Sequence, residues 1–259
     1  MILVFGKQGQ LAQAFHETTP QHLEGQTVFV SSHEANFEKE NFLEGYLDHQ
    51  GPEIIILCSA YTQVDKAEEE KQLAEQLNVI APREIARWCG KNDALLIHFS
   101  TDYVFNGEGQ NPWQEGDETD PLNWYGETKM LGEQVIQSSG CRHFIFRTSW
   151  VYSENGKNFV KTMLKLGRDK SSLRVVADQV GSPTYAHDIA ENVWKLVDRY
   201  KAGEALKYGL YHMAGQGFTN WAEFAEKIFA ESTRLKSEFK IEEVEGIPTS
   251  DYPTAAERP

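Results

Sequence analysis

Ile2-Leu3-Val4-Phe5-Gly6-Lys7-Gln8-Gly9-Gln10-Leu11-Ala12 is the stretch that decides the fold, because it joins an apolar run, a glycine turn and the start of a helix. The apolar run predicts a buried strand that ends at Gly6, and the segment after Gly9 predicts a helix. Such a turn lets backbone N–H groups approach a pyrophosphate, whose charge the helix dipole favours. The spacing is G-x-x-G with Ala12 in place of a third glycine. Alone, this turn is equally compatible with an ordinary strand-to-helix connection.

Further apolar runs with strand character follow at residues 27–31, 53–58, 94–100 and 143–148, separated by segments with helical spacing. Alternating strands and helices predict an α/β fold, a Rossmann-like doubly wound parallel sheet. After residue 150 the alternation loosens, with helices predicted at 158–167 and 184–200, strands at 173–177 and 209–214, and a helix capped by Thr219. We therefore expect a dinucleotide-binding domain in residues 1–150 and mostly a smaller substrate-binding lobe in residues 151–259.

Composition limits the kinds of partner. The 259 residues include 25 Lys plus Arg against 39 Asp plus Glu, a net charge of −14, which disfavours nucleic acid and anionic membranes as main partners. The three cysteines are widely spaced and form no metal-binding pattern, so we expect neither disulfides nor a metal site. The sequence shows no basic leader and no apolar run of about twenty residues, so we expect a cytoplasmic protein without signal peptide or membrane span.

Candidate ligand-binding residues follow the predicted strands, at the edge where open α/β sheets bind ligands. After the second strand, Ser31-Ser32-His33 precede Glu34, so the acidic residue that usually contacts the ribose of NAD is missing from its expected place and both NADPH and NADH stay possible. Small polar residues after the third strand could hold the adenine half of a dinucleotide. His98 is interpreted as a satisfied core residue, and the charged run 65–71 as a solvated helix face. The candidate cofactor contacts are Gly6, Gly9, Gln10, Leu11, Ser31, Asn36, Phe37, Ala60, Tyr61, Thr62, Phe99, Tyr125 and Lys129.

The candidate catalytic residues are Thr101, Tyr125 and Lys129. On a helix that spans residues 125–138, Tyr125 and Lys129 lie one turn apart on the same face. We expect the lysine charge to lower the pKa of the phenol from about 10 toward neutrality, where it can act as a general acid or base. The Thr101 hydroxyl could polarise a carbonyl held beside the phenol. Since a Y-x-x-x-K pair also occurs by chance on helix surfaces, this pattern needs its partners to indicate catalysis.

Taken together, the motifs resemble those of the dTDP-4-dehydrorhamnose reductases, members of the extended short-chain dehydrogenase/reductase superfamily. The resemblance covers the whole chain and rests on Gly6-Lys7-Gln8-Gly9-Gln10, Val64-Asp65-Lys66-Ala67-Glu68, Ser100-Thr101-Asp102-Tyr103-Val104-Phe105, Tyr125-Gly126-Glu127-Thr128-Lys129, Arg147-Thr148-Ser149-Trp150-Val151-Tyr152 and Asp178-Gln179-Val180-Gly181-Ser182-Pro183-Thr184.

This resemblance implies reduction of dTDP-4-dehydro-L-rhamnose to dTDP-L-rhamnose with NADPH or NADH. It implies that Tyr125 donates the proton to the C4 oxygen, that Lys129 binds the nicotinamide ribose and that Thr101 contacts the keto group. Asp102 and Trp150 would contact the sugar nucleotide together with Thr101 and Tyr125.

The sequence departs from the family pattern in four places, one of which is the missing acidic residue after the second strand. Family members can dimerise through a magnesium ion held partly by a glutamate of the first helix, where this chain has Ala14, so a homodimer stays possible but that metal is in doubt. Ala12 replaces the usual third glycine. The chain ends at Pro259, where relatives continue, so part of the substrate lobe was expected to be absent. Two alternatives stay open: a non-catalytic NADP-binding regulatory subunit, and another nucleotide-sugar epimerase or dehydratase.

Overall fold

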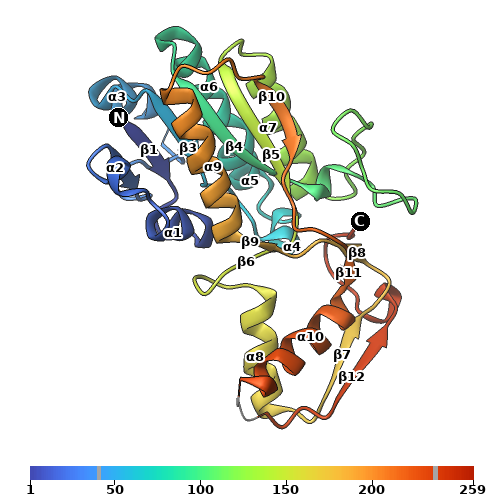
Figure 1. Ribbon diagram of the computed structural model, residues 1–259. Helices are drawn as coiled ribbons and strands as arrows, with labels where there is room; N and C mark the ends of the chain where they lie inside the picture. Colours follow the sequence, from blue (N-terminus) through green and yellow to red (C-terminus); the bar gives the residue numbers. More distant parts are fainter. Residues whose placement is uncertain (40–41, 236–238) are drawn as a thin grey trace.

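A computed structural model describes residues 1–39, 42–235 and 239–259. Its centre is a six-stranded parallel sheet in the order β10-β5-β4-β3-β1-β2 (Figure 1). Because the strand order reverses around β1 and β3, the sheet is doubly wound, which confirms the α/β class predicted from the sequence. The strands span Ile2–Phe5 (β1), Thr27–Val30 (β2), Ile54–Leu57 (β3), Leu95–Thr101 (β4), Arg142–Thr148 (β5) and Gly209–His212 (β10).

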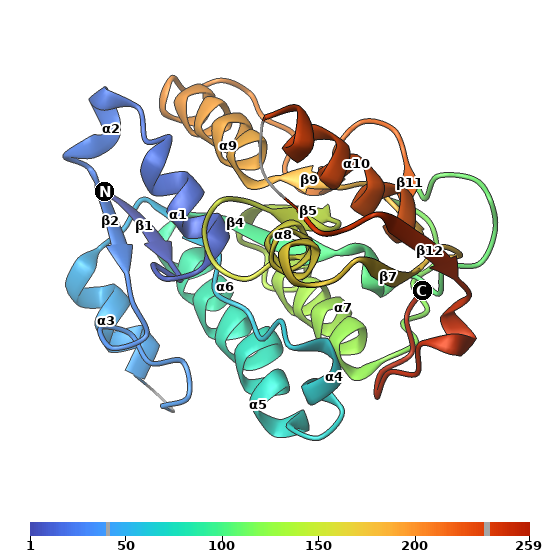
Figure 2. The same ribbon diagram turned by 90° about the horizontal axis from the view of Figure 1, so that it is seen from below.

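Helices cover both faces of this sheet (Figures 1 and 2). One face carries α1 (Gln10–Glu17) and α9 (Ala186–Lys201), whose Phe15 and Trp194 meet edge to face at 5.3 Å in the core. The other face carries α3, α6 and α7, which bury a second apolar cluster. The remaining elements of this unit are α2 (Gln21–Glu24), α3 (Phe42–Gln50), α4 (Val64–Ala67), α5 (Lys71–Glu75), a π-helical turn (Gln76–Ile80), α6 (Ala81–Asn92), a 3₁₀ turn (Asp102–Val104) and α7 (Trp124–Gln137).

A smaller unit lies beyond the carboxyl ends of the strands (Figure 1). There α8 and α10 pack on the two-stranded sheet β7–β12 around a core of their own. Its elements, with the short pairs that join it to the large sheet, are β6 (Val151–Tyr152), α8 (Phe159–Asp169), β7 (Ser172–Val176), β8 (Val180–Gly181), β9 (Thr184–Tyr185), β11 (Thr219–Asn220), α10 (Trp221–Arg234), β12 (Glu243–Ile247) and a 3₁₀ turn (Thr249–Asp251). Between these, α9 and β10 return to the large sheet, so the division at residue 150 stays a prediction.

Two local expectations are wrong. The unbroken run Val28-Phe29-Val30 is typical of a buried strand, but β2 is an edge strand in which Val28 is 38% exposed, because only β1 pairs with it. Thr219 was expected to cap the last long helix, but the N-cap is Asn220, whose Oδ1 accepts the backbone N–H of Glu223 at 2.9 Å. Thr219 instead pairs with Gly181 in a short strand, so the helix begins one residue later.

None of the helices in the described ranges has the combination of length and apolarity that is needed to cross a lipid bilayer.

Candidate active site

The glycine turn between β1 and α1 has the geometry that a pyrophosphate needs. Gly6 adopts φ +95°, and a Cβ on it would lie 3.0 Å from the backbone N and the Oγ of Ser59. Gly9 is the N-cap of α1, and within the described chain no side chain caps this helix and no acidic residue lies in its first turn. The free N–H groups of the first turn and the positive end of the helix dipole therefore fit a phosphate anion.

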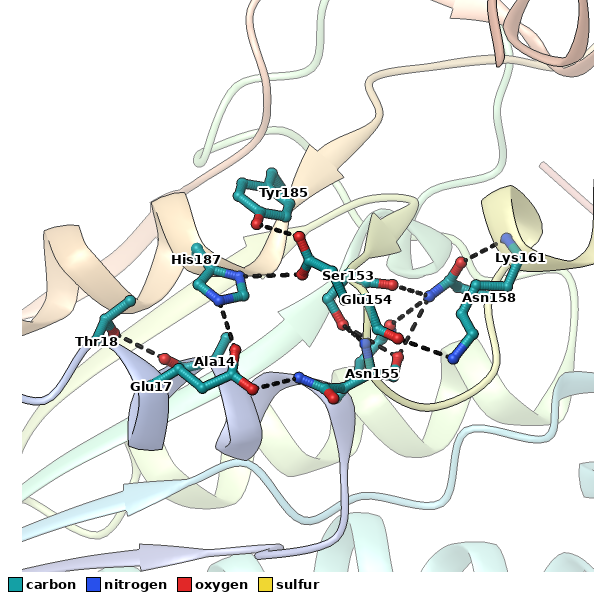
Figure 3. A network of polar contacts seen from close by, with 11 residues as sticks. Ala14, Glu17, Thr18, Ser153, Glu154, Asn155, Asn158, Lys161, Tyr185 and His187 are labelled. Atoms are coloured by element: carbon teal, nitrogen blue, oxygen red, sulfur yellow. Dashed lines mark hydrogen bonds and ion pairs between the residues drawn. The ribbon is translucent and has the colours of Figure 1, made fainter. Parts of the chain in front are cut away.

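A polar network connects this turn to the start of the smaller unit. Gln10, the first residue of α1, donates from Nε2 to the carbonyl of Val151 at 3.1 Å and accepts from Asn158 Nδ2 at 3.3 Å. Further along the same helix, Glu17 lies 2.8 Å from His187 Nε2 and accepts from Asn155 at 2.8 Å (Figure 3). The loop that leads into the smaller unit is thus held against the glycine turn.

Glu34 places a carboxylate at the end of β2, where the sequence had indicated that an acidic ligand was missing. Its Oε2 accepts from the Ser31 hydroxyl at 2.6 Å and from the Ser31 backbone N–H at 2.9 Å, and the first of these bonds is the main cause of its lowered pKa. Two other candidate cofactor contacts lie nearby. The Asn36 side chain accepts a hydrogen bond from the backbone N–H of Glu38, and the buried Phe37 ring packs on Phe5.

After β3 the three candidate cofactor residues differ in exposure. Ala60 is half-buried and Thr62 is exposed, so both are open to a ligand. Tyr61 is 4% exposed and its hydroxyl donates to Glu70 at 2.6 Å, while Asn78 binds both its backbone N–H and its carbonyl. Tyr61 therefore shapes this loop from within the protein.

At the end of β4, Thr101 connects two neighbouring groups. Its hydroxyl donates to Asp102 Oδ1 at 2.9 Å and accepts from the Tyr103 N–H at 3.2 Å. Burial raises the pKa of Asp102 to about 6, although the Thr101 hydrogen bond acts against this. The Thr101 side chain also hydrogen-bonds Tyr125, so the predicted threonine and tyrosine do meet at one edge of the sheet.

The helix that carries Tyr125 is fixed at its start by several contacts. Asn123 caps α7 by accepting the Gly126 N–H at 2.8 Å, and Glu68 accepts the Trp124 N–H at 2.7 Å. A Cβ on Gly126 would overlap the carbonyl oxygen of Tyr103, so only glycine allows this close approach of α7 to the end of β4. The Tyr125 ring meets the Tyr103 ring edge to face at 5.6 Å.

The pKa of Tyr125 differs from the expectation. Burial raises the pKa of Tyr125 to about 12, the Thr101 hydrogen bond lowers it, and the nearby Asp102 carboxylate raises it further. The expected lowering by Lys129 is absent because the lysine points inward: its Nζ donates to the Phe99 carbonyl at 2.6 Å and lies 3.3 Å from His98 Nε2. Tyr125 is therefore a protonated phenol over the whole ordinary pH range, as a proton donor must be.

Lys129 is buried close to two other buried charged side chains, Glu133 and Arg147. It is 2% exposed, and burial lowers its pKa to about 8 while Glu133, one turn further along α7, acts to raise it. Glu133 forms a bidentate pair with Arg147 of β5, with N···O distances of 2.9 and 2.6 Å. These contacts fix the side of α7 that faces the sheet, and with it the orientation of Tyr125.

Trp150, directly after β5, has a strained backbone. Its φ is +46°, a region that bulky residues rarely adopt. Its ring stacks on Trp221 of α10 with centroids 3.4 Å apart, and it packs on Gly181, where a Cβ would overlap it. The tryptophan thus joins the large sheet to the smaller unit.

The charged run 65–71 is predicted to be a solvated helix face, but two of its carboxylates make contacts with distant parts of the chain. Glu68 holds the start of α7, as described above, and Asp65 accepts from Arg258 at 2.7 Å and from the Ala256 N–H at 3.1 Å. Both contacts are long-range, and helical spacing alone cannot reveal them. The available signal in the sequence was that Asp65 and Glu68 are three residues apart and therefore lie on one face of a helix.

Ala14 is fully buried in the core beneath α1 and offers no ligand atom. In the described part of the chain, no group of three or more His, Cys, Asp or Glu side chains could hold a metal ion.

This fold and site define a class: a protein with a dinucleotide-binding Rossmann-like sheet and a Tyr-x-x-x-Lys pair beside a threonine, as in short-chain dehydrogenase/reductases. The family described as "RmlD substrate binding domain" matches residues 1–259. The chain is 38% identical to the dTDP-4-dehydrorhamnose reductase of Salmonella typhimurium over 262 residues, covering 100% of this chain and 87% of the relative. This protein belongs to the dTDP-4-dehydrorhamnose reductase family.

Solved structures of reductases named as dTDP-4-dehydrorhamnose reductases have the same fold as this chain. The dTDP-4-dehydrorhamnose reductase of Bacillus anthracis, in complex with NADP, aligns with a TM-score of 0.91 at 35% identity, covering 100% of this chain and 87% of that one. The Clostridium acetobutylicum reductase aligns with a TM-score of 0.89 at 33% identity, with the same coverage. UDP-glucose 4-epimerase from Brucella ovis shares the fold alone, with a TM-score of 0.75 at 16% identity, 98% of this chain and 91% of that chain.

Proposed function

We propose that this protein reduces the C4 keto group of dTDP-4-dehydro-L-rhamnose with NADPH or NADH, giving dTDP-L-rhamnose for polysaccharide biosynthesis. The observation that carries the proposal is that Tyr125 and Thr101 share a hydrogen bond at the sheet edge that also holds the glycine turn. The family supplies the substrate, because full-length relatives at 35–38% identity bear the name of this reductase.

On the cofactor side, the bound nicotinamide supplies the hydride that adds to the keto carbon. The uncapped first turn of α1 would hold the pyrophosphate, and Lys129, while it keeps its contacts with the Phe99 carbonyl and His98, would bind the nicotinamide ribose with its remaining N–H donor. The proposed cofactor contacts are the sequence candidates Gly6, Gly9, Gln10, Leu11, Ser31, Asn36, Phe37, Ala60, Tyr61, Thr62, Phe99, Tyr125 and Lys129.

On the proton side, Tyr125 donates its phenolic proton to the oxygen of the keto group as the hydride adds to its carbon. The Thr101 proton, which is directed to Asp102 in this structure, turns to the same oxygen and stabilises the developing negative charge. Each group thus has one task, and the products are the C4 alcohol and the oxidised cofactor.

The smaller unit, mostly within residues 151–259, is proposed to bind the sugar nucleotide. Trp150 supports this, because it lies where the chain passes from β5 to that unit, and Asp102 lies at the end of the neighbouring strand β4. The stacked pair of Trp150 and Trp221 gives this passage a rigid aromatic wall.

The test is an assay of cofactor oxidation at 340 nm. We expect purified protein to oxidise NADPH or NADH only when dTDP-4-dehydrorhamnose is added, with dTDP-L-rhamnose as the product by chromatography. Cofactor binding without turnover would instead support the regulatory-subunit alternative. Conversion of the substrate to another sugar without net cofactor oxidation would support an epimerase or dehydratase.

Glu34 sets the expected cofactor preference. Its carboxylate, held at the end of β2 by Ser31, repels a ribose 2′-phosphate, so Glu34→Gln should raise kcat/KM for NADPH relative to NADH several-fold. The control is Glu38→Gln, which is exposed on the same segment as Glu34, whereas Ser31 binds Glu34; this control should leave the ratio unchanged. If the ratio of kcat/KM for NADPH to that for NADH were the same in wild type and Glu34→Gln, the ribose 2′-position would not lie beside Glu34.

We further propose a cytoplasmic location and, for any homodimer, an interface that does not use a magnesium ion at Ala14. The burial of Ala14 supports the second proposal. Sedimentation with and without magnesium tests it, since a magnesium-dependent mass would contradict it.

A further inference from the structure

His98 is a buried, ionisable side chain that the mechanism above does not use. It lies on β4, is 1% exposed, and its Nε2 is 3.3 Å from Lys129 Nζ. Its other ring nitrogen, Nδ1, is buried and has no hydrogen-bond partner among the described residues. A buried polar atom without a partner is costly. The contact between His98 Nε2 and Lys129 Nζ offsets part of this cost.

The chemistry of the two groups determines the direction of this contact. A lysine ammonium carries three donors and no acceptor, so it can bind only to a ring nitrogen with a free lone pair. His98 must then be neutral, with its proton on Nδ1. Burial and the neighbouring Lys129 charge hold the pKa of His98 well below its usual range, so it stays an acceptor at working pH.

Few groups share the surroundings of Lys129. From its own helix, Tyr125 and Glu133 face it, and both oxygens of Glu133 are bound by Arg147 of β5. Asp102 lies at the end of β4, beside Tyr125. The direct hydrogen-bond partners of Nζ are therefore both on β4: the Phe99 carbonyl and His98.

We propose that His98 is a positioning residue for Lys129: its Nε2 lone pair, with the Phe99 carbonyl, holds the lysine as an ammonium below Tyr125. The inference deepens the proposed function, because it matters through the contact between Lys129 and the cofactor. Without this acceptor, burial opposes the charged form of Lys129 more strongly, and its pKa falls below about 8. Lys129 then loses its proton at a lower pH.

The test is the affinity for NADH, followed by its fluorescence between about pH 6 and about pH 9.5, a range in which NADH itself does not change charge. Wild-type affinity should be constant below about pH 8 and decrease above it, as Lys129 loses its proton. His98→Phe should move this midpoint down by about one pH unit. It would then bind roughly fivefold more weakly at about pH 8 and equally well near pH 6.

Two polar variants separate positioning from packing. His98→Gln places an amide oxygen near the position of Nε2 and should restore the midpoint, whereas His98→Asn is one carbon shorter, reaches only the position of Nδ1, and should not. This contrast holds even where His98→Phe fails to fold.

An unchanged midpoint in His98→Phe or His98→Asn, or an affinity loss that is the same at every pH, would overturn the role of His98 while leaving the proposed function intact. Wild-type protein that binds neither NADH nor NADPH would overturn the proposed function itself, and this inference with it.

Discussion

Tyr125→Phe should lower kcat for reduction of dTDP-4-dehydrorhamnose by roughly two orders of magnitude or more, because it removes the proton donor. The dissociation constant of the cofactor should change much less than kcat, since a phenylalanine keeps the ring in place and removes only one hydroxyl among the proposed cofactor contacts. The measurement is steady-state kinetics together with NADH fluorescence titration.

The matched control is Tyr103→Phe, the same chemical change on the ring that packs against Tyr125. This variant should keep kcat within a few-fold of wild type. If Tyr125→Phe retained more than about a tenth of the activity, general acid catalysis by this phenol would be excluded as the main contribution.

Arg147→Met should have the largest effect on stability. Arg147 and Glu133 are 6% and 2% exposed, and the substitution would leave the Glu133 carboxylate buried without its cation. Breaking such a pair costs about 3–5 kcal/mol of unfolding free energy. Urea unfolding followed by circular dichroism measures the loss.

Two controls separate this charge effect from others. In the double variant Glu133→Leu with Arg147→Met, no unpaired charge stays behind, and stability should return to within about 2 kcal/mol of wild type. Lys91→Met, which breaks an exposed pair with Glu44, should cost less than about 1 kcal/mol. A loss in Arg147→Met no larger than in Lys91→Met would show that the buried pair does not contribute to stability.

The main sheet could be predicted because its signals are local. Apolar runs such as residues 2–5 and 54–57 are long enough to identify buried strands, and both are fully buried in the structure. The one-turn spacing of Tyr125 and Lys129 follows from helix geometry alone. Since parallel strands end at the same edge, the sequence also predicted that Thr101 and Tyr125 would meet there.

The expectations that failed depend on contacts between distant segments. The direction of the Lys129 side chain is decided by His98 and Phe99, about thirty residues away on β4, and the pKa of Tyr125 by burial. Likewise, only the tertiary structure shows Glu68 at the start of α7. The edge position of β2 depends on the order of strands in the sheet, which local composition does not encode.

The central claim is that Tyr125, Thr101 and Lys129 surround the carbon that exchanges hydride with the cofactor. A crystal structure of this protein with NADPH and dTDP-L-rhamnose tests it most directly. We expect the sugar C4 hydroxyl at about 2.6–3.2 Å from the Tyr125 hydroxyl, with the sugar C4 carbon about 3–3.5 Å from the nicotinamide ring. A nicotinamide bound away from Tyr125, or a C4 hydroxyl that contacts neither Tyr125 nor Thr101, would contradict it.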